Sequence, residues 1–171
     1  MISSADQSLG ILPALWHRSA MFSMTPRILK FLLNIYPPYI GAGVRVHSIS
    51  GDWKELTVSM PLRWYNRNIL KTHFGGSLYS MVDPHLVLLL MQLLGKDYIV
   101  WDKSAEIEFV RPGRSRVWCT IAIPDGEVVA IRDQTESNKP CYPEFELKIV
   151  DSHGELVARV KKTLYVKRKH S

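Results

Sequence analysis

The feature that most constrains this chain is the segment 77–95, SLYSMVDPHLVLLLMQLLG, which is apolar on almost every side. A helix that is apolar all round has to be buried over most of its surface. A strongly curved antiparallel sheet wrapped around the helix provides such cover. The longest apolar run, Leu86 to Leu94, is shorter than the roughly 20 residues that cross a bilayer. We therefore expect a buried central helix and no membrane span.

The segments on both sides of this helix alternate between apolar and polar residues, which is typical of strands in a sheet with one solvated face. Thr25 and Pro26 are typical of a helix start, and Pro37-Pro38 of its end. A short helix is expected within 125–137. The predicted order is helix, two strands, long helix, two strands, short helix, two strands, which is an α+β fold. The alternating segments are 43–50, 53–61, 104–112, 116–124, 142–151 and 155–167.

The length of 171 residues favours a single domain. We expect this domain to span 25–171, after a loosely ordered N-terminal arm over 1–24. The arm lacks the basic and long apolar regions of a signal peptide. Cys119 and Cys141 lack CxxC spacing, and a domain of this size needs no disulfide framework. These features favour the cytoplasm, and no His or Cys cluster predicts a metal site.

The net charge of +6 favours anionic partners, although the simpler explanation of such a charge is solubility alone. The chain has no zinc-finger spacing, no RNP-like aromatic motif and no helix-turn-helix pattern. Nucleic acid is therefore not an expected partner.

The stretch NRNILKTHFGGSLYSMVDP, at the start of the long helix, carries a spaced set of residues: Asn68, Phe74, Gly75, Gly76 and Asp83. With the element order, this set resembles the hot-dog superfamily, and the spacing resembles the phenylacetate-pathway type of acyl-CoA thioesterase. The chain is most similar to an uncharacterised hot-dog branch catalogued as a domain of unknown function.

In the thioesterase pattern an Asn precedes a His-Gly-Gly by six residues, and an Asp follows the His by nine. Asn68, Gly75, Gly76 and Asp83 occupy the matching positions here. The His position holds Phe74 instead, with His73 one place earlier. The Gly that usually lies between the Asn and the His is replaced by Lys71.

The resemblance implies hydrolysis of an acyl thioester, with Asp83 as general base or nucleophile. Gly76 lies at a helix start, where unpaired N–H groups and the helix dipole can stabilise an oxyanion. Gly76 and Asp83 are seven residues apart, about 10 Å along a helix axis, so they cannot act on one carbonyl within one chain. The hypothesis therefore requires a homodimer, alone or paired into a tetramer, with sites across the interface.

Further residues are expected to bind the substrate. Asn68 is expected to orient water or the thioester, and His73 to replace part of the missing His, beside Phe74 and Gly75. Coenzyme A carries phosphates, and the loop RPGRSR offers Arg111 and Arg114 to bind them. Coenzyme A enters only as part of the substrate, and no separate cofactor is implied.

Each of these roles has a structural alternative. Asp83 stands before Pro84, which is typical of a residue that caps a second helix. The two glycines suit close packing of the helix start, and the arginines suit a solvated loop. The alternative function is a non-catalytic hot-dog module that binds acyl-CoA or acyl groups, or serves assembly.

Overall fold

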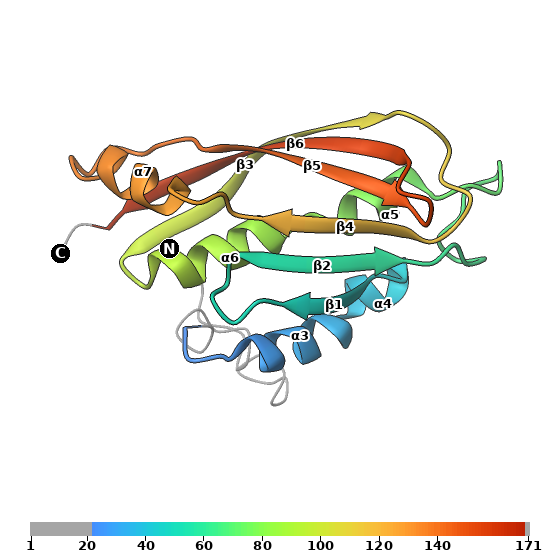
Figure 1. The fold of residues 1–171 in the computed structure, drawn as a ribbon, viewed down its shortest axis with the longest axis horizontal. Helices are drawn as coiled ribbons and strands as arrows, with labels where there is room; N and C mark the ends of the chain where they lie inside the picture. Colours follow the sequence, from blue (N-terminus) through green and yellow to red (C-terminus); the bar gives the residue numbers. More distant parts are fainter. Residues whose placement is uncertain (1–21, 170–171) are drawn as a thin grey trace, which may run out of the picture.

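The computed structural model describes residues 22–169, and Figure 1 shows their arrangement. The predicted arm therefore lies outside the described residues, apart from 22–24. The element order matches the prediction, with an additional short helix, α4. The elements are α3 (Pro26–Asn34), α4 (Pro37–Ala42), β1 (Arg45–Ile49), β2 (Glu55–Met60), α5 (Gly75–Ser80), α6 (His85–Leu94), β3 (Tyr98–Phe109), β4 (Val117–Ala122), α7 (Glu127–Gln134), β5 (Glu144–Asp151) and β6 (Leu156–Arg168).

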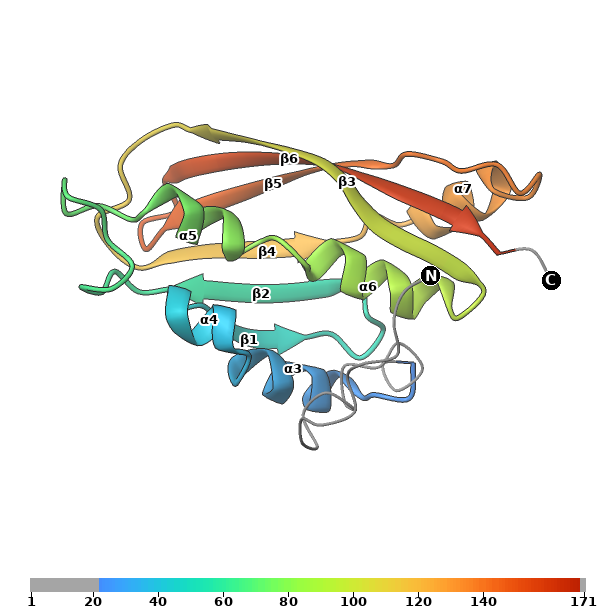
Figure 2. The same cartoon turned by 180° about the vertical axis from the view of Figure 1, so that it is seen from behind.

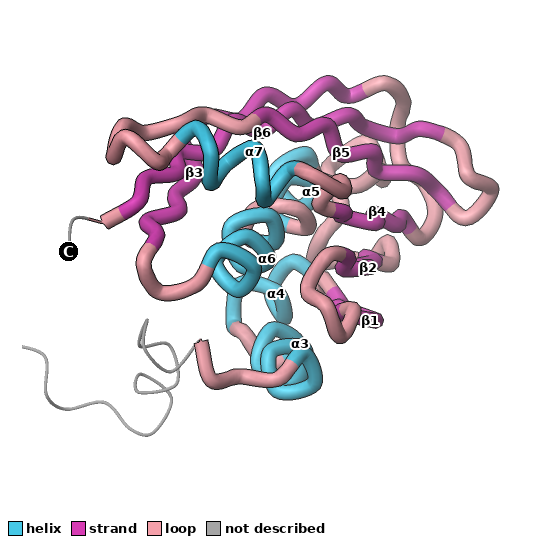
Figure 3. Tube along the Cα trace, turned by 60° about the vertical axis from the view of Figure 1, so that its left-hand side comes forward, coloured by secondary structure: helices cyan, strands magenta, loops and turns pink. Residues whose placement is uncertain are grey.

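The six strands form one antiparallel sheet in the order β1-β2-β4-β5-β6-β3. One face of the sheet carries the core, and in β2 the core residues Leu56, Val58 and Met60 are fully buried. Figure 2 shows the other side of the molecule, where α5 and α6 lie against this face. In Figure 3 the strands curve around α6, so the predicted α+β architecture is confirmed.

The central helical stretch runs over Gly75–Leu94 and is interrupted at 81–84, between α5 and α6. By length and composition, these 20 residues could cross a membrane. The apolar run Leu86–Leu94 alone is too short to do so. Most of α6 is buried in the core, including Leu86 and Leu90. Burial against the sheet accounts for the apolar character of this stretch.

The first helix begins as the sequence predicts. Thr25 is the N-cap of α3 and its hydroxyl accepts a hydrogen bond from the Ile28 N–H at 3.4 Å, with Pro26 at the first helical position. Leu29 and its neighbours on the inner face of α3 are buried, and Ile28 is exposed. The helix ends at Asn34, before Pro37 as predicted, and Pro37 and Pro38 also begin α4, because proline fits the first turn of a helix.

Among residues 22–169, strand β3 lies at an edge of the sheet and pairs with β6 alone. The alternation in 104–112 places Ala105, Ile107 and Phe109 on one face of this strand, and that face is only partly covered within one chain. Ala105 and Phe109 are exposed, and Ile107 is partly buried. Trp101 is 62% exposed on the same strand. An edge strand with uncovered apolar side chains is a typical surface for association.

Candidate functional site

The loop before α5 is organised by the side chain of Asn68. Its carbonyl oxygen accepts hydrogen bonds from the N–H groups of Leu70 at 2.9 Å and Thr72 at 3.1 Å. Its amide nitrogen donates to the Thr72 hydroxyl at 2.9 Å. These bonds give Asn68 a structural role in the loop, and its role toward a substrate stays a prediction.

Lys71 lies in the same loop with a φ of 59°. This left-handed conformation strains residues with a side chain and favours glycine. The thioesterase pattern carries a Gly at this position. The backbone at Lys71 therefore keeps the conformation that suits a Gly. Lys71 is strained in this conformation because it has a side chain.

Helix α5 begins at Gly75, with Phe74 as its N-cap. The N–H groups of Ser77 and Leu78 both donate to the Phe74 carbonyl oxygen, at 3.0 and 3.1 Å. The Gly75 and Gly76 amides precede these bonds and have no partner within the helix. The start of the helix therefore presents donors that can stabilise an anion.

Both glycines are close to aromatic rings. A Cβ atom on Gly75 would lie 2.8 Å from the Phe109 ring, and one on Gly76 would lie 2.6 Å from the Phe74 ring. These short distances support the structural alternative for the glycines, which is close packing of the helix start. Phe74 and Phe109 are both more than half exposed, so these rings can move aside.

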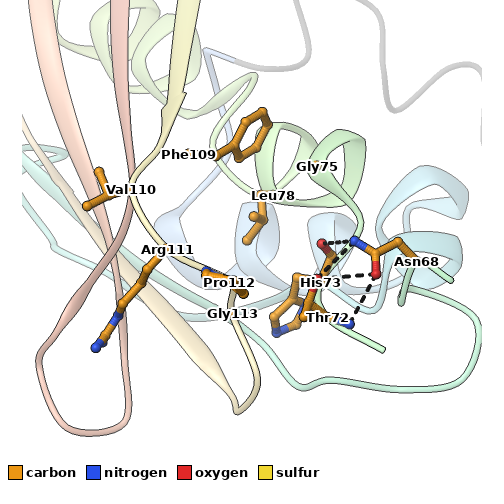
Figure 4. A pocket seen from close by; sticks show the side chains of 10 residues that line it. All are labelled: Asn68, Thr72, His73, Gly75, Leu78, Phe109, Val110, Arg111, Pro112 and Gly113. Carbon is orange, nitrogen blue, oxygen red and sulfur yellow. Dashed lines mark hydrogen bonds between the residues drawn. The ribbon is translucent and has the colours of Figure 1, made fainter. Parts of the chain in front are cut away.

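An open cavity of about 400 Å³ lies beside this helix start (Figure 4). It brings together four of the predicted site residues, namely Asn68, His73, Gly75 and Arg111. Phe74, Gly76, Arg114 and Asp83 are not part of its lining. The walls are completed by Thr72, Leu78, Phe109, Val110, Pro112 and Gly113.

His73 is buried in the wall of this cavity. Its Nε2 atom lies 2.8 Å from the Ser115 carbonyl oxygen, so Nε2 carries the proton and donates. Nδ1 is then an acceptor, and it is buried without a hydrogen-bond partner among residues 22–169. Burial lowers the pKa of His73, and the bond to Ser115 opposes this shift. The ring is therefore neutral near pH 7.

The two arginines predicted to bind phosphate differ in their surroundings. Arg111 lies 2.9 Å from Asp151 and 3.5 Å from Glu155. Its charge is therefore partly balanced by carboxylates. Arg114 is exposed and has no ion pair among the described residues.

Asp83 lies in a different cluster, in the turn between α5 and α6. Its Oδ1 atom lies 3.6 Å from Nζ of Lys162, whose side chain is 0% exposed. Lys162 also lies 2.8 Å from Oδ1 of Asp102 and donates to the backbone carbonyl of Asp83. The Asp83 side chain remains 47% exposed, so a buried cation holds a carboxylate that solvent and a substrate can reach.

Tyr79 completes this cluster. Its ring centroid lies 5.6 Å from the Lys162 Nζ atom. Burial raises the pKa of the Tyr79 hydroxyl, and a hydrogen bond to Asp83 raises it further. Burial also raises the pKa of Asp102, although Lys162 opposes that shift. Tyr79 and Asp102 line a second open cavity, of about 460 Å³, with the middle of β3.

The capping role proposed for Asp83 is wrong in this structure. A second helix does begin after the Asp-Pro pair, as that alternative required. However, Pro84 is its N-cap and no side chain caps it. The Asp83 carboxylate pairs with Lys162 and Tyr79 instead.

Lys162 was missed by the sequence analysis, although the sequence contains a signal for it. The alternation in β6 that places Ala158 and Val160 in the core also places Lys162 and Leu164 there, and all four are buried. A lysine on the inward face of a strand needs carboxylate partners. The identity of those partners, on α5–α6 and β3, depends on the tertiary fold.

His85 is a further buried polar residue next to Asp83. Its Nε2 atom lies 3.0 Å from the hydroxyl of Tyr39, and both side chains are buried. Burial lowers the pKa of His85 to about 3. The pair connects α4 to the start of α6 and helps to fix the turn that carries Asp83.

This shift predicts a pH dependence of stability. An unfolded histidine has a pKa of about 6.5, so below that pH the unfolded state binds more protons than the folded state. The His85 contribution to stability is complete above about pH 6.5 and is lost progressively as the pH falls toward 3. Between pH 7 and 5 we expect the parent to lose about 2 kcal/mol more unfolding free energy than His85→Gln, as measured by urea unfolding.

The control is His153→Gln, since His153 is exposed. It should keep the pH dependence of the parent. An unchanged pH dependence in His85→Gln would contradict the assignment to His85.

Among residues 22–169 no three His, Cys, Asp or Glu side chains form a group that could hold a metal ion. The absence of a metal or a redox cofactor stays a prediction.

Solved structures from several bacteria share the fold of this chain. PA5026 of Pseudomonas aeruginosa, described as of unknown function and a probable thioesterase, matches with a TM-score of 0.74 and 14% identity, over 83% of this chain and 95% of its own. A Chlorobaculum tepidum protein of unknown function gives 0.69 and 20%, over 86% and 99%. Thioesterase HI1161 of Haemophilus influenzae gives 0.63 and 14%, over 87% and 94%. At these identities the likeness shows the fold alone.

The six-stranded antiparallel sheet packed on a long central helix, matched by thioesterase structures, defines a protein of the hot-dog fold. The predicted fold class and resemblance are confirmed. The chain belongs to the family described as Domain of unknown function (DUF4442), whose model matches residues 25–166. A search of curated proteins found no relative.

Proposed function

We propose that the protein hydrolyses an acyl thioester, such as an acyl-CoA, in sites formed between two copies of the chain. The observation that carries this proposal is the half-exposed Asp83 carboxylate, which a buried lysine holds at one end of α5. The free amides of Gly75 and Gly76 lie at the other end. Each element is incomplete alone, and an antiparallel pairing of two such helices would join them.

The edge strand β3 supports this pairing. Its unpaired edge can add a second copy of β3, as exposed strand edges do. Trp101 and Phe109, 62% and 55% exposed, would be covered in such a dimer. Two-fold symmetry would form the site twice, because an interface of this kind uses the same surface on both copies.

The proposed hydrolysis uses Asp83, a water molecule and the Gly76 N–H of the other copy. Asp83 would take a proton from water, and the resulting hydroxide oxygen would attack the thioester carbonyl carbon. The Gly76 N–H of the other copy would stabilise the oxyanion. Collapse would break the C–S bond, and the thiolate would leave and take a proton. As a nucleophile, Asp83 would attack the carbonyl itself, and water would then release the acyl group.

Phe74 favours the second candidate, a non-catalytic module that binds acyl-CoA or acyl groups or serves assembly. Its phenyl ring cannot accept or donate a proton at the position where the thioesterase pattern has a His. Free-thiol release from short, medium, long and aryl acyl-CoAs separates the two candidates. Turnover supports hydrolysis, while saturable binding without turnover supports the module.

Cytoplasmic localisation, and a homodimer alone or paired into a tetramer, stay predictions.

The oxyanion role of Gly76 can be separated from packing with a matched pair of variants. Gly76→Ala and Gly76→Pro both add a Cβ atom beside the exposed Phe74 ring. Only proline removes the N–H, and proline is tolerated in the first turn of a helix. We expect turnover in Gly76→Pro to be about 10²-fold below that of Gly76→Ala, measured by thiol release. Equal turnover in the two folded variants would exclude this donor.

A further inference from the structure

A cavity of about 480 Å³ lies between α4, the start of β1, the segment after β2 and Arg116, which directly precedes β4. Its lining includes three arginines, Arg45, Arg63 and Arg116. No Asp or Glu is among the residues that line it. Among residues 22–169 no ion pair reaches these three arginines. The cavity therefore gathers positive charge that the described protein does not balance.

The walls of this cavity are fixed by a buried asparagine, Asn66. Its amide nitrogen donates to the carbonyl oxygens of Ala42 and Pro61, both at 2.9 Å. Its carbonyl oxygen accepts from the Arg63 N–H at 2.7 Å. These bonds join the end of α4 to the segment that carries Arg63. The arginines are thus attached to backbone whose position is set in advance.

Arg116 is positioned by a second buried group. Its Nη1 atom lies 3.1 Å from the hydroxyl oxygen of Ser59, which is 0% exposed. Ser59 in turn lies 2.7 Å from Nε2 of His47. Burial lowers the pKa of His47, and the charges of Arg45, Arg116 and Lys30 lower it further. The charges of Arg45 and Arg116 therefore act together on one neighbouring side chain.

We propose that this cavity binds a phosphate group through Arg45, Arg63 and Arg116. Guanidinium groups match phosphate oxygens in geometry and form strong, charge-assisted hydrogen bonds with them. Exposed Ile40 and Tyr65 also line the cavity, so it can accommodate an apolar part next to the phosphate. A soluble phosphorylated compound and a phospholipid headgroup present the same group. The inference does not depend on thioester hydrolysis.

The test measures pyrophosphate binding by isothermal titration calorimetry at low salt. The double variant Arg45→Gln/Arg63→Gln is expected to weaken binding at least about tenfold. The control Lys161→Gln/Arg168→Gln removes the same charge from exposed positions of β6 and should stay within about twofold of the parent. Circular dichroism checks that all variants are folded.

A second arm identifies the source of the phosphate. Sedimentation with phosphatidylcholine vesicles that contain phosphatidylglycerol, lost in the arginine variant but kept in the control, supports a headgroup. Pyrophosphate binding without sedimentation supports a soluble ligand. The proposal is overturned if the parent binds neither probe, or if the control loses binding as much as the arginine variant does.

Discussion

Asp83→Asn is expected to lower thioester turnover about 10³-fold, because it removes the proposed base or nucleophile and keeps the size of the side chain. The fold should survive the change. Lys162 keeps Asp102 at 2.8 Å and the Asp83 backbone carbonyl as partners. The half-exposed ion pair that is lost contributes about 1 kcal/mol or less. The measurement is thiol release, with urea unfolding of the same samples.

Asp102→Asn is the matched control, because it removes the other carboxylate from the same lysine. Asp102 is closer to Lys162 than Asp83 is, so this variant should lose at least as much stability and yet keep most of its turnover. Equal losses of turnover in the two variants would assign the effect to the charge balance of Lys162. Full turnover in Asp83→Asn would exclude the proposed mechanism.

Mixed dimers test whether the site crosses an interface. A dimer of one Asp83→Asn chain and one Gly76→Pro chain has one site with both changes and one site with neither. Random mixing after refolding makes about half of the dimers mixed, so about a quarter of the parent turnover should return. A site contained within one chain would give no recovery.

The fold was predictable because it follows from local patterns. Period-two segments flank one helix too apolar to be exposed, and the order of elements then leaves few α+β arrangements. Which apolar side chains are buried within one chain was less predictable. The inner positions of β3 alternate correctly, yet Ala105 and Phe109 remain exposed. Periodicity identifies which residues share a face, and it cannot tell whether the same chain covers that face.

The candidate site was predictable only in part, for a similar reason. Asn68, Gly75 and Gly76 are close in sequence, and the structure keeps them together at one helix start. Lys162 is 79 residues from Asp83, and only the packing of the sheet on the α5–α6 stretch brings the two close. The pairing of β6 with β3 brings Lys162 close to Asp102. Contacts of this kind depend on register and sheet order, which no short motif records.

Lys162→Met should lower the free energy of unfolding by about 3 kcal/mol, because it leaves two carboxylates without their buried cation. Methionine preserves most of the apolar stem, so the lost charge dominates the effect. The control Lys161→Met changes the neighbouring exposed residue and should stay within about 0.5 kcal/mol of the parent. Urea unfolding at pH 7 measures both.

Two further measurements separate the loss of the Lys162 charge from the loss of its packing. The deficit of Lys162→Met should shrink as the pH falls, because burial raises the pKa of Asp102 and protonation of Asp102 removes its repulsion with Asp83. Asp102→Asn in the Lys162→Met background should restore part of the lost stability, which a double-mutant cycle would measure as coupling. A deficit that is independent of pH and of Asp102 would mean that Lys162 acts through its stem alone. Its ammonium would then not be what holds Asp83 in place.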